Sequence, residues 1–385
     1  MADYFIGLMS GTSADGVDAV LCEISDTHSS VLEALCMPFP ESLRAALARI
    51  MSRNEAILLR DMGELDRELG LAFANAAMTL MSKASVPASR VKAIGSHGQT
   101  IFHSPEGDRP FTWQAGDPNI IAARTGVVTV ADFRRKDMAL GGQGAPLVPA
   151  FHQAVFGKHG TRRGILNIGG IANLTILGDG GPIRGFDVGP GNCLMDIWCQ
   201  RHLGKEFDRD GEWAAGGQPD SELLASFLGH PFIQREPPKS TGREIFNEAW
   251  LEGRLQSLVH RVNARDVQAT LLEFTARCVL DSMDKHLPQA ELLAVCGGGT
   301  HNRALLDRLQ VLLPGCRVCS TMELGLDPDW VEGAAFAWLA HRTLSGATGN
   351  LPSVTGASPK PCSGKLQAGR AFPEKILFLP QIRQG

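Results

Sequence analysis

The order of predicted elements repeats in the two halves of the chain. In the first half, strands over residues 4–9 and 18–24 flank the polar turn SGTSADGV, and a third strand follows over 31–37. In the second half, strands over 164–168 and 174–177 flank the turn GGIAN, and a third strand follows over 183–188. Each half is therefore expected to begin with three strands in antiparallel meander order.

Helices are predicted to follow each meander. In the first half, a strand over 91–96 should end in the polar loop SHGQT, and in GDPNIIAARTG the acid Asp117 suits a helix N-cap while Gly126 suits its end. The remaining predicted elements are helices over 41–53, 61–82, 193–202, 221–228, 248–262, 267–286, 303–313 and 330–344, and strands over 127–131, 291–296 and 317–320. The Pro/Gly/Ser-rich segment 346–364 reads as irregular chain.

This doubled order is typical of the superfamily of actin, hexokinase and Hsp70, in which two hairpin turns hold the phosphates of a nucleotide. The expected fold is α/β: a two-lobed actin-like ATPase, or duplicated ribonuclease H-like, fold with a nucleotide cleft between the lobes. We expect residues 1–133 to form the first lobe, with the C-terminal segment 346–385 as a candidate for completing it, and residues 134–345 to form the second.

Composition excludes several classes of function. The 385 residues carry 37 Lys and Arg against 41 Asp and Glu, a net charge of −4 with no long run of one sign, which argues against nucleic-acid binding through a basic face. No apolar run suits a signal peptide or a membrane span, so the expected location is the cytoplasm. The nine cysteines stand mostly in apolar surroundings typical of reduced thiols, and Cys316 and Cys319 suit a strand rather than a zinc or redox site.

Three glycine-containing turns favour phosphate binding. Residues 10–16 offer backbone N–H groups together with the hydroxyls of Ser10, Thr12 and Ser13. The pair Gly169 and Gly170, and the run 297–299 at a strand end before a helix, offer similar close access to the backbone. Each turn alone suits an ordinary hairpin, but the three together predict a phosphate site. The P-loop and Rossmann fingerprints are absent from the sequence.

Among Asp15, Asp18, Asp132, Asp137 and Asp187, the last is the best candidate for proton transfer. Asp187 ends an apolar strand before the tight loop GPGN, and its alternative role is to cap the helix after this loop. Asp15 suits either a Mg²⁺ site or an Asx turn.

Basic and imidazole side chains offer substrate contacts. Arg134 and Arg135 could pair with a substrate carboxylate or form a solvated charge cluster. His97 suits a sugar contact or a buried, hydrogen-bonded histidine. The sequence has no zinc or serine-hydrolase motif.

Eight motifs together resemble one family, the anhydro-N-acetylmuramic acid kinases. They are GLMSGTSADGVDAV, GSHGQTIFHSP, WQAGDPNIIAARTG, VADFRRKDMALGGQGAPLVPAFH, LNIGGIANLT, GFDVGPGNCLMD, CGGGTHN and NLPSVTGAS, in family order over residues 6–357. The resemblance implies a kinase of cell-wall (peptidoglycan) recycling. From 1,6-anhydro-N-acetylmuramic acid, ATP and water, such an enzyme makes N-acetylmuramic acid 6-phosphate and ADP.

The resemblance also implies roles for residues at the matching positions. Asp187 would be the general base that activates water for attack at C1, and Arg134 and Glu332 would bind the amino sugar. His97 is a further candidate for binding the sugar, and Asp15 is the candidate for holding Mg²⁺. The ATP-binding residues would be Gly11, Thr12, Ser13, Ala14, Asp15, Gly16, Val17, Asp18, Gly169, Gly170, Asn173, Gly297, Gly298 and Gly299.

Two features depart from the wider pattern, and three alternatives stay open. Where most of the superfamily carries an Asp in the first strand, this chain reads IGLMSG, so waters and Asp15 are expected to hold the metal. The tail 367–385 matches no motif. The alternatives are a nucleotide-gated scaffold, a glycoside hydrolase and a kinase of another amino sugar. The oligomeric state is open, with a homodimer as one candidate.

Overall fold

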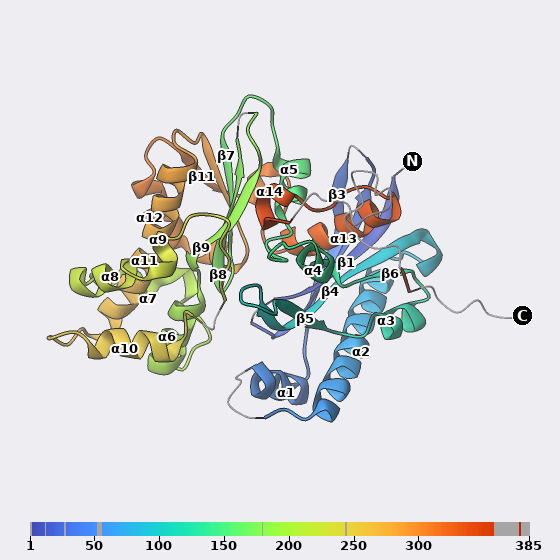
Figure 1. The fold of residues 1–385 in the computed structure, drawn as a ribbon, viewed down its shortest axis with the longest axis horizontal. Helices are drawn as coiled ribbons and strands as arrows, with labels where there is room; N and C mark the ends of the chain where they lie inside the picture. Colours follow the sequence, from blue (N-terminus) through green and yellow to red (C-terminus); the bar gives the residue numbers. More distant parts are fainter. Residues whose placement is uncertain are drawn as a thin grey trace, which may run out of the picture. The chain divides into compact units, whose positions relative to one another are not determined.

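The chain divides into two units in the computed structural model (Figure 1). The first comprises residues 1–155 and 330–385, and the second comprises residues 156–329. The structure describes residues 2–11, 13–26, 28–51, 56–178, 180–242, 245–357 and 377–378. The division differs from the expected boundaries at 133 and 345. Residues 134–155 and helix α13 (Val331–Leu344) belong to the first unit, because α13 packs against the strands of that unit.

The sheet of the first unit begins with the predicted meander. Strands β1 (Asp3–Ser10), β2 (Gly16–Ile24) and β3 (Ser29–Pro38) are antiparallel neighbours, with Met9 opposite Asp18. Strand β4 (Val91–Ser104) lies parallel to β1 on its other side, and β6 (Thr129–Val130) lies parallel to β4. The short strands β5 (Phe111–Ala115) and β12 (Leu377–Phe378) pair with β4 and β6. The strand order is β12-β6-β4-β1-β2-β3.

The sheet of the second unit repeats this arrangement. Strands β7 (Arg163–Ile168), β8 (Ile171–Leu177) and β9 (Arg184–Pro190) form the meander, and β10 (Leu292–Cys296) and β11 (Arg317–Ser320) add in parallel beside β7. The order β11-β10-β7-β8-β9 corresponds to β6-β4-β1-β2-β3. The shared strand order and strand directions confirm that each unit has the ribonuclease H-like fold, and thus that the fold is duplicated.

Helices complete both units. In the first unit they are α1 (Glu41–Met51), α2 (Leu59–Lys83), α3 (Pro118–Thr125), α4 (Phe133–Ala139), α5 (Pro149–Phe156), α13 and α14 (Pro352–Thr355). In the second they are α6 (Cys193–Leu203), α7 (Glu212–Ala215), α8 (Ser221–Leu228), α9 (Pro231–Gln234), α10 (Glu248–Gln256), α11 (Ala264–His286) and α12 (Arg303–Leu312). None of the described helices is long and apolar enough to cross a bilayer.

Helix α13 packs unusually close to the first sheet. Successive side chains of a strand point to opposite faces, so Ile6 and Leu8 join the core that contains α2, while Gly7 faces α13. A Cβ atom on Gly7 would lie 1.7 Å from the carbonyl oxygen of Gly333, and one on Gly333 would lie 2.3 Å from Val20. The small residues of WVEGAAFAW therefore allow α13 to approach the strands closely.

Several predicted elements differ from the structure. Strand β4 continues through SHGQT to Ser104 instead of ending at residue 96, because β5 pairs with its distal half. The helix predicted over 248–262 ends at Gln256, and Val259 beyond it is 94% exposed and so adds nothing to a core. Strand β5 and helices α4 and α5 were not predicted from the sequence. The caps of α3 are as predicted: Asp117 accepts a hydrogen bond from the backbone N–H of Asn119, and Gly126 has φ 70°.

A buried histidine predicts acid sensitivity of the first unit. His152 on α5 is fully buried, and burial lowers its pKa to about 3. Between pH 6.5 and pH 3 the unfolded chain therefore binds a proton that the folded chain does not, so stability falls on acidification. We expect this residue alone to remove about 2 kcal/mol of unfolding free energy at pH 5. Urea denaturation at pH 7.5 and pH 5.0 measures the loss.

The variant His152→Leu isolates that contribution. Between pH 7.5 and pH 5.0 both proteins should lose unfolding free energy. We expect the loss in the variant to be smaller than that in the wild type by about 2 kcal/mol. An equal pH dependence in His152→Leu and wild type would contradict this account.

Candidate active site

Hydrogen bonds from β4 hold the turn between β1 and β2. Ser10 donates a hydrogen bond to Gln99 Oε1 over 2.6 Å, and Gln99 Nε2 donates to the carbonyl oxygen of Gly11 over 3.2 Å. At the tip, the Ser13 hydroxyl donates to Asp15 Oδ1 over 2.9 Å. Thr12, predicted to bind ATP, lies outside the described residues. Gln99 is thus a supporting residue of this turn that the sequence analysis did not assign.

The two glycines of this turn serve different purposes. A Cβ atom on Gly16 would lie 2.6 Å from the carbonyl oxygen of Met37, so packing against β3 requires glycine there. A Cβ atom on Gly11 would meet only the Ser13 hydroxyl, at 3.9 Å. The backbone at Gly11 is therefore open to close approach by a ligand, as an anion-binding turn requires.

Arg134 and His97 form a connected pair in the first unit. Arg134 Nε donates to His97 Nε2 over 3.0 Å, and Arg134 Nη1 donates to the carbonyl oxygen of Gly144 over 2.8 Å. His97 is buried, and its Nδ1 lies 2.8 Å from the carbonyl oxygen of Gly98, which fixes Nδ1 as the protonated nitrogen. Burial, followed by the charge of Arg134, lowers the pKa of His97 well below its ordinary value. His97 is therefore a neutral acceptor that orients the guanidinium.

Glu332 lies in the first turn of α13, within the electrostatic reach of Arg134 and Asp18. Burial raises the pKa of Glu332, while the charge of Arg134 lowers it and that of Asp18 raises it. The structure therefore joins Arg134 to His97 by a hydrogen bond, and the charges of Arg134 and Asp18 both act on Glu332. Arg135 differs from its neighbour, because it is exposed and forms an ion pair with Asp132 over 3.3 Å.

Asp137 has a structural role. Its buried carboxylate accepts hydrogen bonds from the backbone N–H of Gly144 over 2.7 Å, from the Thr355 hydroxyl over 2.6 Å, and from Asn350. These contacts connect the loop of ALGGQGAP to NLPSVTG. The two motifs thus hold the carbonyl of Gly144 to which Arg134 donates.

In the second unit, Asp187 lies on β9 opposite Asn173 on β8. Its side chain is 8% exposed, and Oδ2 accepts a hydrogen bond from the backbone N–H of Thr241 over 2.8 Å. The residue at the N-cap position of α6 is Asn192, and its side chain makes no cap hydrogen bond. A buried carboxylate with one oxygen oriented by an N–H group suits proton transfer.

Glycine turns lie near the ends of β7 and β10. A Cβ atom on Gly297, which has φ 76°, would lie 2.3 Å from Asn167 Oδ1, and one on Gly299 would lie 2.3 Å from Ile168. These glycines let the loop after β10 pack onto β7. At Gly298 and Gly169, by contrast, the nearest atoms to a Cβ would be 3.9 Å and 3.7 Å away, so their backbone is open to a ligand.

Unpartnered polar atoms accompany these turns. The buried atoms Asn167 Oδ1 and Thr300 Oγ1 have no hydrogen-bond partner among the described residues, and neither do the hydroxyls of Ser240 and Thr241. Buried polar groups are normally hydrogen-bonded, so these atoms suit a polar ligand. The segment around Thr241 was missed by the sequence analysis; its only signal was the polar run KSTG after two prolines.

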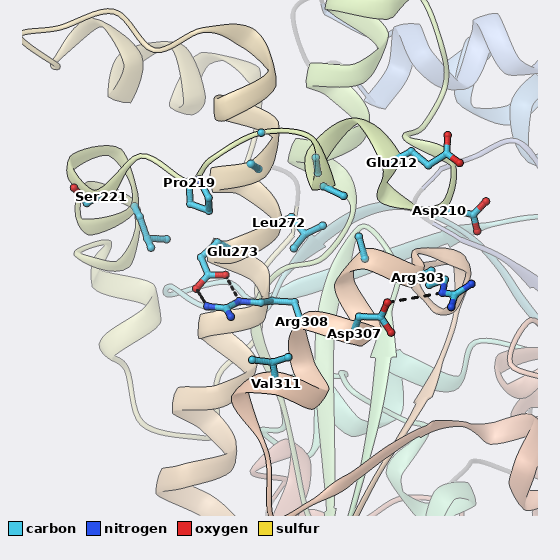
Figure 2. Close-up of a pocket in the computed structure, with 16 residues that line it drawn as sticks. Asp210, Glu212, Pro219, Ser221, Leu272, Glu273, Arg303, Asp307, Arg308 and Val311 are labelled. Atoms are coloured by element: carbon cyan, nitrogen blue, oxygen red, sulfur yellow. Dashed lines mark hydrogen bonds and ion pairs between the residues drawn. The ribbon is translucent and has the colours of Figure 1, made fainter.

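A large pocket of the second unit lies elsewhere (Figure 2). Its volume is about 1060 Å³, and helices α7, α8, α11 and α12 supply most of its lining. Within it, the buried Glu273 accepts two hydrogen bonds from Arg308, over 2.6 and 2.7 Å, and also pairs with Arg277. None of the predicted site residues lines this pocket.

The cysteines in the described part of the chain are reduced and mostly buried. The eight cysteines in the described part of the chain form no disulfide, and seven of them are buried. Burial raises the pKa of Cys316 to about 11 and also raises that of Cys319, which keeps both as neutral thiols. In the described part of the chain, no three His, Cys, Asp or Glu side chains gather to hold a metal.

Comparison with known proteins identifies the family. A family model described as anhydro-N-acetylmuramic acid kinase matches residues 3–368. The chain belongs to this family. Two anhydro-N-acetylmuramic acid kinases illustrate the similarity. That of Shewanella loihica is 50% identical, covering 95% of this chain and 99% of its own. That of Vibrio parahaemolyticus is 48% identical, covering 92% and 96%.

Among solved structures, component A of (R)-2-hydroxyglutaryl-CoA dehydratase from Acidaminococcus fermentans shares 10% identity over 89% of this chain and 99% of its own, with a TM-score of 0.46. A likeness at this level adds nothing to the topology described above. As a member of the anhydro-N-acetylmuramic acid kinase family, the chain is a kinase, an enzyme that transfers a phosphoryl group.

Proposed function

We propose that this kinase opens the 1,6-anhydro ring of anhydro-N-acetylmuramic acid with water while it phosphorylates O6. The oxygen of water attacks C1, the bond from C1 to O6 breaks, and O6 receives the γ-phosphoryl group of ATP. The water proton passes to Asp187, and the products are N-acetylmuramic acid 6-phosphate and ADP. The carrying observation is the buried Asp187 carboxylate, which the Thr241 N–H orients on β9. No separate general acid is needed, because O6 is both leaving group and phosphoryl acceptor.

Candidate phosphate-binding turns occur in each unit. In the first unit, the open backbone at Gly11 and the hydroxyl-bearing turn up to Asp18 would hold phosphate oxygens. In the second unit, Gly169, Gly170 and Asn173, together with the run 297–299, would bind the nucleotide. The open backbone at Gly169 and Gly298, and the unpartnered Asn167 Oδ1 and Thr300 hydroxyl, support this assignment.

The amino sugar would be bound by Arg134 and Glu332. Because both nitrogens of His97 are engaged within the protein, we propose that His97 acts on the sugar through Arg134 and does not contact it directly. A guanidinium matches a carboxylate, such as that of the lactyl group, through its planar set of N–H donors.

The donors near the first turn fit Mg²⁺. Asp15 is exposed, and its carboxylate is the oxygen ligand that Mg²⁺ prefers, with phosphate oxygens and water completing the octahedron. Asp15 would hold the ion through one oxygen or through water, and the ion would neutralise charge on the phosphates during transfer. We place the reaction in the cytoplasm, where ATP is available.

Mass spectrometry tests this function. The purified protein is incubated with ATP, Mg²⁺ and 1,6-anhydro-N-acetylmuramic acid in ¹⁸O-labelled water. We expect a sugar product that is heavier by one phosphate and one water, with the label at C1. An unchanged sugar beside consumed ATP would indicate another acceptor or a nucleotide-gated scaffold. Ring opening without phosphate would indicate a hydrolase.

A further inference from the structure

The segment between α9 and α10 lies along β9 at Asp187. The backbone N–H of Asp187 donates to the carbonyl oxygen of Lys239 over 3.1 Å, and the backbone N–H of Thr241 returns a bond to Asp187 Oδ2 over 2.8 Å. The two bonds hold both the main chain and the side chain of Asp187 against residues 239–241. No motif of the sequence analysis included this segment.

Lys239 anchors the segment from within the protein. It is 3% exposed, and its Nζ donates to the carbonyl oxygens of Phe232 and Ile233 over 3.4 and 3.2 Å. The ammonium group also lies 5.0 Å from the centre of the Phe232 ring. Burial lowers the pKa of Lys239. Burying an ammonium group is unfavourable unless its N–H donors are hydrogen-bonded. These contacts therefore fix the position of Lys239 and of the residues that follow it.

Thr241, whose backbone N–H donates to the Asp187 carboxylate, also carries a hydroxyl. Its Oγ1 is buried without a hydrogen-bond partner among the described residues, and the same holds for the Oγ of Ser240. A buried hydroxyl without a partner is unfavourable, because it has lost its hydrogen bonds to water. A carboxylate and unpartnered hydroxyls on a segment bonded to it therefore suit a small polar group that hydrogen-bonds to both.

We propose that Thr241 is a second catalytic residue of the water attack. Its backbone N–H orients Asp187, its hydroxyl holds the attacking water, and Lys239 is the positioning residue that keeps Thr241 in place. In the step, the water gives its proton to Asp187 while its oxygen bonds to C1; Thr241 accepts or donates only a hydrogen bond and changes no covalent bond. This inference rests on the proposed function.

The variant Thr241→Val tests the hydroxyl, because it keeps the backbone N–H and the shape of the side chain. We expect kcat to fall about 10- to 100-fold, as for loss of one positioned group in the reacting site. The KM values for sugar and ATP should stay within about 3-fold of wild type, and Thr241→Ser should restore kcat to within about 3-fold. A purely structural role would not produce this split together with rescue by serine.

Two further variants complete the test. Thr161→Val removes an exposed hydroxyl that donates to the carbonyl oxygen of Lys158 in the same unit, and it should leave kcat unchanged. Lys239→Met should lower kcat in the same way as Thr241→Val, with unchanged ADP affinity by calorimetry.

The outcomes separate this inference from the proposed function. A kcat of Thr241→Val within 3-fold of wild type, or a serine variant as impaired as the valine variant, would overturn it. So would a loss confined to the KM of the sugar. If the wild-type protein forms labelled product and Thr241→Val has a kcat within 3-fold of wild type, the proposed role of Thr241 is wrong but the proposed function stands. If wild-type protein forms none, the proposed function fails with it.

Discussion

Asp187→Asn should lower kcat about 10³-fold or more, because an amide cannot take the proton of the attacking water. A positioned general base contributes about 10²- to 10⁴-fold to a rate. The Asn oxygen can still accept the hydrogen bond from the Thr241 N–H, so the fold and the affinity for ADP should be retained. Steady-state kinetics by ADP release in the presence of the sugar measures the loss, and circular dichroism checks the fold.

The matched control is Asp220→Asn. Asp220 lies in the same unit, and its carboxylate also accepts a backbone N–H, that of Leu223 over 2.8 Å, at the start of α8. The same chemical change there should leave kcat within about 2-fold of wild type. Asp187→Asn with more than a tenth of wild-type kcat would contradict the assignment of the base.

Gly7→Ala should destabilise the first unit by about 3 kcal/mol or more. The added Cβ would lie 1.7 Å from the carbonyl oxygen of Gly333 and 2.7 Å from the backbone nitrogen of Ala337. Both atoms belong to the backbone of α13, so no side-chain rotation can relieve the contact and the helix must move. Urea denaturation measures the loss, and hydrogen–deuterium exchange of β1, β4 and α13 locates it.

The same substitution at Gly63 provides the control. Gly63 lies within α2, and a Cβ atom there would meet nothing within 4 Å. Gly63→Ala should therefore stabilise the protein by about 0.5–1 kcal/mol through helix propensity and reduced freedom of the unfolded chain. A loss at Gly7 below 1 kcal/mol would show that α13 is not held by this contact.

The repeated strand order was predictable because period-2 patterns and polar turns are local signals. The caps of α3 at Asp117 and Gly126 were predictable for the same reason. The assignment of α13 to the first unit was not predictable, because it depends on Gly7 meeting Gly333, residues distant in sequence. Such pairings are set by packing, and no window of sequence contains both partners.

Within the candidate site, single residues were predictable but their partners were not. The tight loop after the strand indicated Asp187, whereas its contacts with Lys239 and Thr241 come from a segment with no helix or strand pattern. Likewise, the sequence indicated His97 as a candidate sugar contact. Only the structure shows that His97 Nε2 accepts a hydrogen bond from Arg134. Polar residues that support other polar residues carry no periodic signal.

The division of the chain has a consequence for its synthesis. The second unit is one continuous segment, whereas the first requires residues from both ends, and Asp137 meets Thr355 218 positions later. A ribosome releases residues in order, and domains fold as units when complete. The second unit can therefore form while the surface of β1 that α13 covers is still exposed on the growing chain. Translation must pass Leu344 before α13 can shield that surface. The first unit is therefore incomplete throughout the synthesis of the second, and during this period chaperones could bind its exposed strand.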